Sequence, residues 1–221
     1  MTLDVEVLPD AQAAAERGAE LIAGAAAQAI AKRDRFTVAV SGGSTPGAMF
    51  AALYGRMPWE KVTIFQVDER IAPDGDPHRN LTLLQRSLPP GGVADVRPMP
   101  VTAHDLEEAA DRYAAALPER FDLVHLGLGP DGHTASLVPG DPVLVDDRDV
   151  ALTAEYQGRR RMTLTYPPLD RARRILWLVT GDDKVDALAR LRAGDSSIPA
   201  GRIAAANALV IADAAAAGSA P

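Results

Sequence analysis

The sequence predicts an α/β fold with a mostly parallel central sheet, and three features of the chain support this prediction. Short, nearly continuous apolar runs rich in Val, Ile and Leu recur along the sequence, as in strands that are covered on both faces. Segments with helical patterns separate these runs, an alternation typical of α/β proteins. The runs lead into glycine-rich or acidic turns, so we expect polar side chains to gather where such folds bind ligands, beyond the carboxyl ends of the strands.

Five apolar runs are predicted as the main strands. Four of them end at turns with glycine or charged residues: Phe36–Val40 before SGG, Val62–Val67 before DER, Leu123–Leu126 before GLG, and Ile175–Val179 before TGDDK. The fifth is Ala208–Ile211, and weaker strand signals lie at Val5–Leu8, Val150–Thr153 and Met162–Thr165.

The segments between the strands have helical patterns. They are Ala11–Lys32, Gly47–Gly55, Leu106–Ala116 and Lys184–Ala193. The Pro- and Gly-rich stretch Ser87–Gly92 is predicted as a loop, and the terminal AAAAGSAP as a frayed tail. Because no linker or internal repeat divides the sequence, we expect a single domain over residues 1–221.

Composition excludes several classes of protein. The 221 residues are 47% hydrophobic and 24% charged, which is typical of a globular domain rather than a disordered chain. A net charge of −7 without a Lys/Arg-rich patch disfavours nucleic acid as a partner. The absence of cysteine excludes disulfides, thiolate metal sites and a Cys nucleophile. The four histidines show no HExxH spacing, so we expect no metal site.

The sequence also gives an expectation of where the protein works. The N-terminus has neither the basic region nor the apolar region of a signal peptide. No apolar run approaches the ~20 residues of a membrane span. We therefore expect a cytoplasmic protein that binds no membrane, either a monomer or a homodimer.

The first candidate site is the segment SGGSTP, which joins the strand Phe36–Val40 to a helix beginning near Pro46. Glycines allow a close approach of the backbone to an anion, and a helix N-terminus offers free N–H groups with a partial positive charge. Gly42, Gly43, Ser44 and Thr45 are therefore candidates for binding a phosphate group. The alternative is a plain capped turn, and the segment is not a P-loop because no GK[ST] follows.

Charged residues form the next candidates. Asp68, Glu69 and Arg70 follow a predicted strand, where they could perform acid–base chemistry or hold an anionic substrate; the alternative is an exposed charge run. Arg161 lies just before a strand signal, and Lys184 lies at a strand-to-helix turn. Arg offers a bidentate fork to a phosphate and Lys a point charge, although either could be a solvated surface cation.

The stretch GLGPDGHTASLVPG, residues 127–140, has two interpretations. Its glycines satisfy G-x-G-x-x-G, a dinucleotide-binding pattern, but Pro130 and Asp131 place a rigid turn and a negative charge where a pyrophosphate would lie. The other interpretation is a catalytic loop in which His133 takes a proton near neutral pH and Asp131 orients it. His125, inside its apolar strand, is interpreted as structural.

Taken together and in order, the motifs resemble the 6-phosphogluconolactonase family over nearly the whole chain. They are SGGSTP, DER with a downstream Arg-Asn, GLGPDGHTASLVPG, RMTLT and G-x-x-K. The glucosamine-6-phosphate deaminases share the scaffold and a similar GDGH loop. The resemblance implies a Rossmann-like α/β/α sandwich. It also implies hydrolysis of 6-phospho-D-glucono-1,5-lactone, a small sugar phosphate, to 6-phospho-D-gluconate, without a cofactor or metal.

The resemblance also implies roles for the candidate residues. Asp131 and His133 match the catalytic pair, and His133 would act as general base on a water that attacks the lactone carbonyl. Backbone N–H groups around Gly129–Gly132, together with Arg70, would stabilise the oxyanion. Ser136 would have a structural or positioning role. The phosphate would be bound by Gly42, Gly43, Ser44, Thr45, Arg161 and Lys184, and the substrate pocket would be shaped by Asp68, Glu69 and Asn80.

Two alternatives remain at this point. A deaminase would continue after the histidine into a Phe-Asn-Glu-Pro run and carry Tyr at the position of Arg70, whereas this chain has Ser136-Leu137-Val138-Pro139 and no acid. A non-catalytic sugar-phosphate sensor would need an attached DNA-binding module, and no helix-turn-helix pattern is recognisable at either end. A sensor would also have no need of the pair formed by Asp131 and His133.

Overall fold

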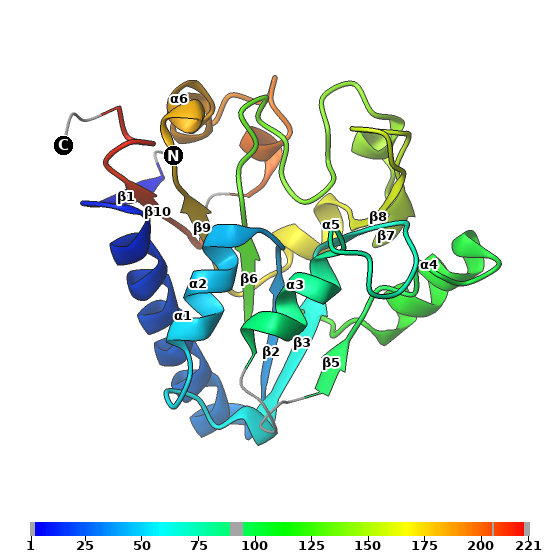
Figure 1. The fold of residues 1–221 in the computed structure, drawn as a ribbon, viewed down its shortest axis with the longest axis horizontal. Coiled ribbons are helices and arrows are strands. Elements are labelled where there is room, and N and C mark those ends of the chain that lie inside the picture. The colour runs from blue at the N-terminus through cyan, green and yellow to red at the C-terminus, as the bar shows by residue number, and fades with distance from the viewer. Residues whose placement is uncertain (1–2, 89–94, 205, 219–221) are drawn as a thin grey trace.

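A seven-stranded parallel sheet organises the computed structural model, which describes residues 3–88, 95–204 and 206–218 (Figure 1). Every neighbouring pair in it is parallel, which confirms the predicted sheet. In spatial order the strands are β1 (Asp4–Leu8), β10 (Ala208–Asp213), β9 (Ile175–Val179), β6 (Leu123–Leu126), β2 (Phe36–Val40), β3 (Val62–Gln66) and β5 (Asp95–Arg97).

Helices cover both faces of this sheet, so the prediction of a Rossmann-like α/β/α sandwich is confirmed. One face packs against α1 (Ala11–Arg33), α2 (Ser44–Ala52) and α3 (Asn80–Ser87), which neighbour one another in Figure 1. The other packs against α4 (Leu106–Ala116), α5 (Tyr166–Asp170) and α6 (Val185–Arg192). Short 3₁₀ turns are η1 (Trp59–Lys61), η2 (Pro142–Val145), η3 (Asp182–Lys184) and η4 (Ala200–Arg202).

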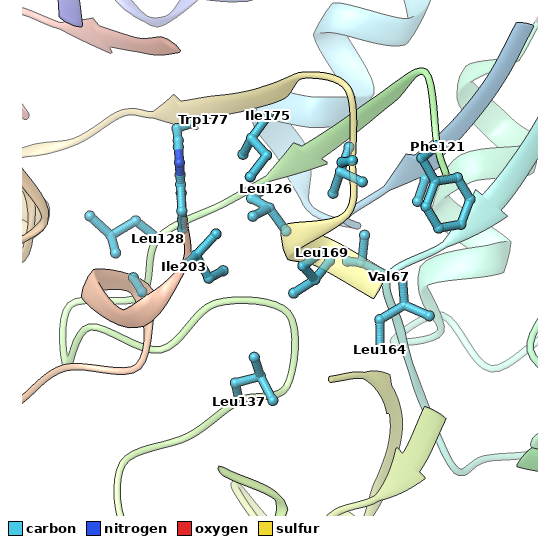
Figure 2. Close-up of a cluster of buried hydrophobic side chains, with 14 of the residues drawn as sticks. Val67, Phe121, Leu126, Leu128, Leu137, Leu164, Leu169, Ile175, Trp177 and Ile203 are labelled. Carbon is cyan, nitrogen blue, oxygen red and sulfur yellow. The ribbon is translucent and has the colours of Figure 1, made fainter. Parts of the chain in front are cut away.

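Alternating side chains of the central strands divide the core into two clusters. In β9, Ile175 and Trp177 belong to the cluster on the α4–α6 face, while Leu176 and Leu178 belong to the cluster on the α1–α3 face. Figure 2 shows the first cluster, in which Trp177 of β9 extends toward Leu128, from the segment after β6, and Ile203, from the segment after η4. Because both faces are covered, every residue of β9 is buried, which explains its uninterrupted apolar sequence.

A second, antiparallel sheet corrects the expectation for the DER segment. Asp68–Arg70 is a strand, β4, rather than a turn at the end of the preceding strand, which closes at Gln66. It pairs with β8 (Arg161–Leu164), which in turn pairs with β7 (Val150–Leu152). The backbone N–H of Leu164 donates to the carbonyl of Val67 at 2.7 Å, so this small sheet begins directly beyond the carboxyl end of β3.

Other differences from the sequence prediction lie at short or peripheral elements. The strand β5 and the helices α3 and α5 were not predicted. Ser87, expected in a loop, closes α3, and residues 89–92 lie outside the described residues. The tail was predicted as frayed, yet Ala216 is 1% exposed and its N–H donates to Asp213 at 2.8 Å; residues 219–221 are not described. Within the described ranges no helix is long and apolar enough to cross a membrane.

His125 of β6 is a fully buried titratable group. Its ring lies edge-on to Phe50, its Nδ1 accepts a 3.4 Å hydrogen bond from the Ser41 N–H, and its Nε2 lacks a partner among the described residues. Burial lowers the pKa of His125 from 6.5 to about 4. The folded protein thus keeps this imidazole neutral at pH values where the unfolded chain protonates it, as expected of a structural histidine.

This burial predicts a pH dependence of stability. Between pH 6.5 and about 4 the unfolded state binds more protons than the folded state. The contribution of His125 to the free energy of unfolding is therefore fully present above pH 6.5 and is lost as the pH falls toward 4. From about pH 8 to about pH 5, the free energy of unfolding should fall by about 2 kcal/mol because of His125 alone. His125→Leu should lack this part of the decline. Urea unfolding of both proteins at both pH values measures it, and equal declines would contradict the prediction.

Candidate active site

The candidate site lies where the chain leaves the neighbouring strands β2 and β6 toward opposite faces of the sheet. The segment after β2 enters α2 on one face, and the segment after β6 packs into the core of the other face. Such a divergence opens a crevice at the carboxyl ends of the strands. Here it holds a cavity of about 330 Å³. Seven predicted site residues line it: Gly42, Asp68, Arg70, Asn80, His133, Arg161 and Lys184.

Asp131 and His133 form a hydrogen-bonded pair at the edge of this cavity. Oδ1 of Asp131 lies 2.6 Å from Nδ1 of His133 and also accepts the backbone N–H of His133 at 3.1 Å. Burial raises the pKa of Asp131, but hydrogen bonds from His133 and Tyr156 outweigh it, so the pKa lies below its ordinary value. An ionised Asp131 accepts the proton on Nδ1, which leaves Nε2 of a neutral His133 as the basic nitrogen.

The glycines of this loop are explained by packing within it. A Cβ at Gly129 would lie 2.0 Å from Nδ1 of His133, so only glycine leaves room for the imidazole. Gly132 has a φ of 83°, and a Cβ there would lie 2.5 Å from Ile198. The G-x-G-x-x-G spacing therefore reflects how the loop holds His133.

The expected oxyanion donors in the Gly129–Gly132 stretch need a correction. The N–H of Gly129 donates to the carbonyl of His133 at 2.8 Å, and the N–H of Gly132 donates to the carbonyl of Gly129 at 2.9 Å. Pro130 has no N–H. These bonds close the loop upon itself, so most of its backbone donors are unavailable to a reacting oxygen.

Arg70 and Arg161 lie opposite each other on two adjacent strands of the small sheet. They are register partners in β4 and β8, and both line the cavity. Arg161 is 4% exposed, and its Nε lacks a hydrogen-bond partner among the described residues. Burial and the charge of Arg70 lower the pKa of Arg161, while Asp68 opposes them. Like charges placed opposite each other are unfavourable, so this arrangement favours binding of an anion.

Asp68 holds neighbouring polar groups in place. It is 5% exposed, and its carboxylate accepts hydrogen bonds from Ser136 Oγ at 2.6 Å and Asn80 Nδ2 at 3.0 Å. Burial raises the pKa of Asp68, although the bond from Ser136 and the two arginines oppose it. The Ser136 hydroxyl donates to a carboxylate inside the protein, which fits a structural role. Asn80 Oδ1 accepts from Arg70 at 2.6 Å, which extends the network to the cavity.

The SGGSTP segment supplies the N-terminus of α2, which begins at Ser44 and has no side-chain cap. A Cβ at Gly42 would lie 2.1 Å from Asn80, so this glycine makes room for Asn80. Gly43, the N-cap, has a φ of 128° and lines an adjoining cavity of about 540 Å³. The Thr45 hydroxyl lies 2.9 Å from that of Thr180 and lines neither cavity.

Sequence reasoning did not single out Tyr156 or Gln157, two residues of the site. Tyr156 contacts both Asp131 and His133, and Gln157 lines the cavity; neither belongs to a recognisable motif. Glu69, expected to shape the site, is fully buried outside the cavity lining, and its carboxylate accepts hydrogen bonds from the backbone N–H groups of Arg70 and Asn80, which line the cavity. No group of three His, Asp or Glu side chains in the described parts of the chain is placed to hold a metal ion.

Comparisons with known proteins found relatives that match nearly the whole chain. A sequence model of the family described as glucosamine-6-phosphate isomerases/6-phosphogluconolactonase matches residues 9–211. A 6-phosphogluconolactonase of Synechocystis sp. is 35% identical over 213 residues, which span 89% of this chain and 88% of that protein.

Solved structures show a shared fold. That of a 6-phosphogluconolactonase from Shewanella baltica OS155 has a TM-score of 0.86 at 24% identity, covering 96% of this chain and 97% of that one. A monomeric glucosamine-6-phosphate deaminase has a TM-score of 0.84 at 17% identity, covering 98% and 99%. Because both activities occur on this fold, the side chains of the cavity must distinguish between them.

Proposed function

The chain belongs to the glucosamine-6-phosphate isomerase/6-phosphogluconolactonase family, and on that premise we propose that it is a 6-phosphogluconolactonase. It is then a carboxylic ester hydrolase that converts 6-phospho-D-glucono-1,5-lactone to 6-phospho-D-gluconate. The observation that carries the proposal is one cavity lined by His133, whose Nδ1 is hydrogen-bonded to an ionised Asp131, and by two arginines paired on adjacent strands. A cavity of about 330 Å³ is large enough for a small sugar phosphate.

Recognition of the substrate follows from the charges of the cavity. Arg161 and Lys184, which line the cavity, would bind the phosphate dianion, together with the uncapped N-terminus of α2, where Gly43 lines the adjoining cavity. The protein carries a net charge of −7, so this local group of cations is needed to attract an anionic substrate. Gly42 and Asn80, whose close packing is fixed by the network around Asp68, would form the wall of the substrate pocket.

Hydrolysis requires a base, an oxyanion donor and an acid. His133 Nε2 would take a proton from water as the water oxygen bonds to the lactone carbonyl carbon, while Asp131 stabilises the imidazolium through Nδ1. Because most of the loop N–H groups are occupied, Arg70 becomes the main candidate for stabilising the oxyanion. Collapse of the tetrahedral intermediate breaks the bond to the ring oxygen, and the protonated His133 returns the proton to that oxygen.

The side chains of the cavity favour a lactonase over a deaminase. Ser136 takes the place of the aromatic residue in the deaminase pattern, and it is buried against Asp68 rather than open to the cavity. Arg70 occupies the position of the deaminase tyrosine and faces Arg161. Asp68 is the only carboxylate among the described residues that line this cavity, and its bonds to Ser136 and Asn80 limit its use in proton transfer.

Activity on freshly generated lactone tests the proposed function. We expect the purified protein to accelerate acid release from 6-phosphogluconolactone above the spontaneous rate, and to act poorly on unphosphorylated gluconolactone, which offers nothing to the cations. Acid release is followed with a pH indicator, and ammonia release from glucosamine 6-phosphate is measured in parallel. Ammonia production without lactone hydrolysis would replace the proposal with a deaminase. Phosphate-ester binding without turnover of either substrate would replace it with a sensor.

A further inference from the structure

We propose that Tyr156 is a positioning residue of this site, which orients the pair formed by Asp131 and His133 and holds Arg161 beside it. The role in catalysis rests on the proposed function, whereas the positioning of the imidazole does not. Tyr156 belongs to none of the motifs by which the chain resembles its family, and it reaches the site from the turn that joins β7 to β8.

The phenol fixes the orientation of the Asp131 carboxylate. The Tyr156 hydroxyl donates to Oδ2 of Asp131 at 3.1 Å, while Oδ1 accepts both hydrogen bonds from His133. The two carboxylate oxygens therefore have separate partners, and rotation of the carboxylate would break the bond to Tyr156. Burial and the charge of Asp131 raise the pKa of Tyr156, so the phenol remains a donor at neutral pH.

The aromatic ring of Tyr156 contacts the two other functional groups. It packs against the imidazole of His133 in a T-shaped arrangement, with ring centroids 5.5 Å apart and planes at 65°. The guanidinium carbon of Arg161 lies 5.1 Å from the centroid of the same ring, within the range of a cation–π contact. One side chain thus connects the proposed general base to a cation of the proposed phosphate site.

The backbone around Tyr156 is built to hold it in place. Tyr156 and Arg159 form an isolated antiparallel bridge, with N–H to carbonyl distances of 3.0 and 3.3 Å. The two residues between them, Gln157 and Gly158, have φ values of 53° and 76°. A two-residue turn with both φ values positive matches the twist of a β-hairpin and closes it tightly. The ring is therefore presented by a short hairpin rather than by a loose loop.

Two substitutions separate the hydroxyl from the ring. Tyr156→Phe keeps the ring but removes the bond to Asp131, so we expect kcat for lactone hydrolysis to fall about tenfold with little change in KM. Tyr156→Leu also removes the cation–π contact, so for this variant we expect KM to rise as well, by about threefold or more. A wild-type kcat in Tyr156→Phe, or an unchanged KM in Tyr156→Leu, would overturn the corresponding part of the proposal.

Two further variants test whether the effect passes through Asp131. The matched control is Tyr54→Phe, the same chemical change at a tyrosine that is 68% exposed and outside the cavity, and it should leave kcat and KM unchanged. In an Asp131→Asn background, adding Tyr156→Phe should lower kcat by much less than tenfold, because residues that act through one group are not additive. If the fold-decrease in kcat of the double variant equals the product of the two single fold-decreases, Tyr156 does not act through Asp131.

A spectroscopic measurement decides the positioning role without any substrate. Nitrogen-15 NMR of the imidazole rings at a pH high enough for the rings to be neutral, with His133 assigned by its loss in His133→Asn, should show His133 protonated at Nδ1 in the wild type. We expect a mixture of tautomers in Tyr156→Phe, and an unchanged Nδ1 tautomer would overturn the inference. If the wild type hydrolyses no lactone, the proposed function fails while this spectrum still decides the role of Tyr156.

Discussion

Replacing His133 with asparagine is expected to lower kcat for 6-phosphogluconolactone hydrolysis by about 10²–10⁴-fold, the usual contribution of a general base. Asparagine keeps a polar side chain in the loop, but it cannot take a proton from water at neutral pH. KM should change little, because the proposed phosphate contacts lie on other elements. Acid release from fresh lactone, corrected for spontaneous hydrolysis at each concentration, measures both constants.

A matched histidine separates this effect from a general loss of structure. His104 lies exposed in the turn before α4 and outside the cavity lining, so His104→Asn should retain the wild-type kcat. The free energy of unfolding of His133→Asn should stay close to that of the wild type, because the His133 side chain is partly exposed and belongs to neither core cluster. A His133→Asn protein with wild-type kcat would exclude His133 as the base and leave the cavity without another candidate of similar geometry.

The sequence predicted the parts of the molecule whose signals are local. The residues of β9 are all buried, so the strand appears as an uninterrupted apolar run. Asp131 and His133 lie two positions apart in one loop, so their contact follows from that loop alone. By contrast, β4 consists of Asp-Glu-Arg, and only its partner β8, far along the chain, identifies it as a strand. The edge strand β5 has charged residues at two of its three positions and gives no apolar signal.

Contacts between distant segments explain what the sequence could not predict about the site. Arg70 and Arg161 are paired by the register of the small sheet, and that register cannot be inferred from either motif alone. Tyr156 reaches Asp131 only because a tight hairpin presents it. Gly42 was selected for its likeness to an anion-binding glycine, whereas in the structure a Cβ there would collide with Asn80. The chemistry of each residue type was informative, but the partner of each residue required the fold.

The helix α3 also lacked a local signal, because the group that caps it comes from β4. The side chain of its N-cap residue, Arg79, forms no cap hydrogen bond. The first N–H groups of the helix, those of Asn80 and Leu81, instead donate to the Glu69 carboxylate at 2.8 and 2.9 Å. Gln66 Nε2 donates to the same carboxylate at 3.0 Å, and so does the N–H of Arg70 at 2.8 Å. Glu69 is fully buried and forms an ion pair with buried Arg79 at 3.3 Å.

This network makes Glu69 the position where we expect a very large loss of stability. Glu69→Ala should lower the free energy of unfolding by about 3–5 kcal/mol, because it leaves the buried Arg79 without this carboxylate and several buried N–H groups without an acceptor. Urea unfolding followed by circular dichroism measures the change. If Glu69→Ala does not fold, Glu69→Gln, which keeps one acceptor oxygen, should still fold with a loss of about 1–3 kcal/mol.

A second glutamate shows whether the loss belongs to this network or to removal of any acidic side chain. Glu60 lies exposed in η1, so Glu60→Ala should change the free energy of unfolding by no more than about 0.5 kcal/mol. The Glu69→Gln protein, although folded, should also have a higher KM for the lactone, because a loosened α3 no longer holds Asn80 against Arg70 at the cavity. A Glu69→Ala protein as stable as the wild type would mean that α3 keeps its N-terminus by other bonds, and that Glu69 does not couple the fold to the site.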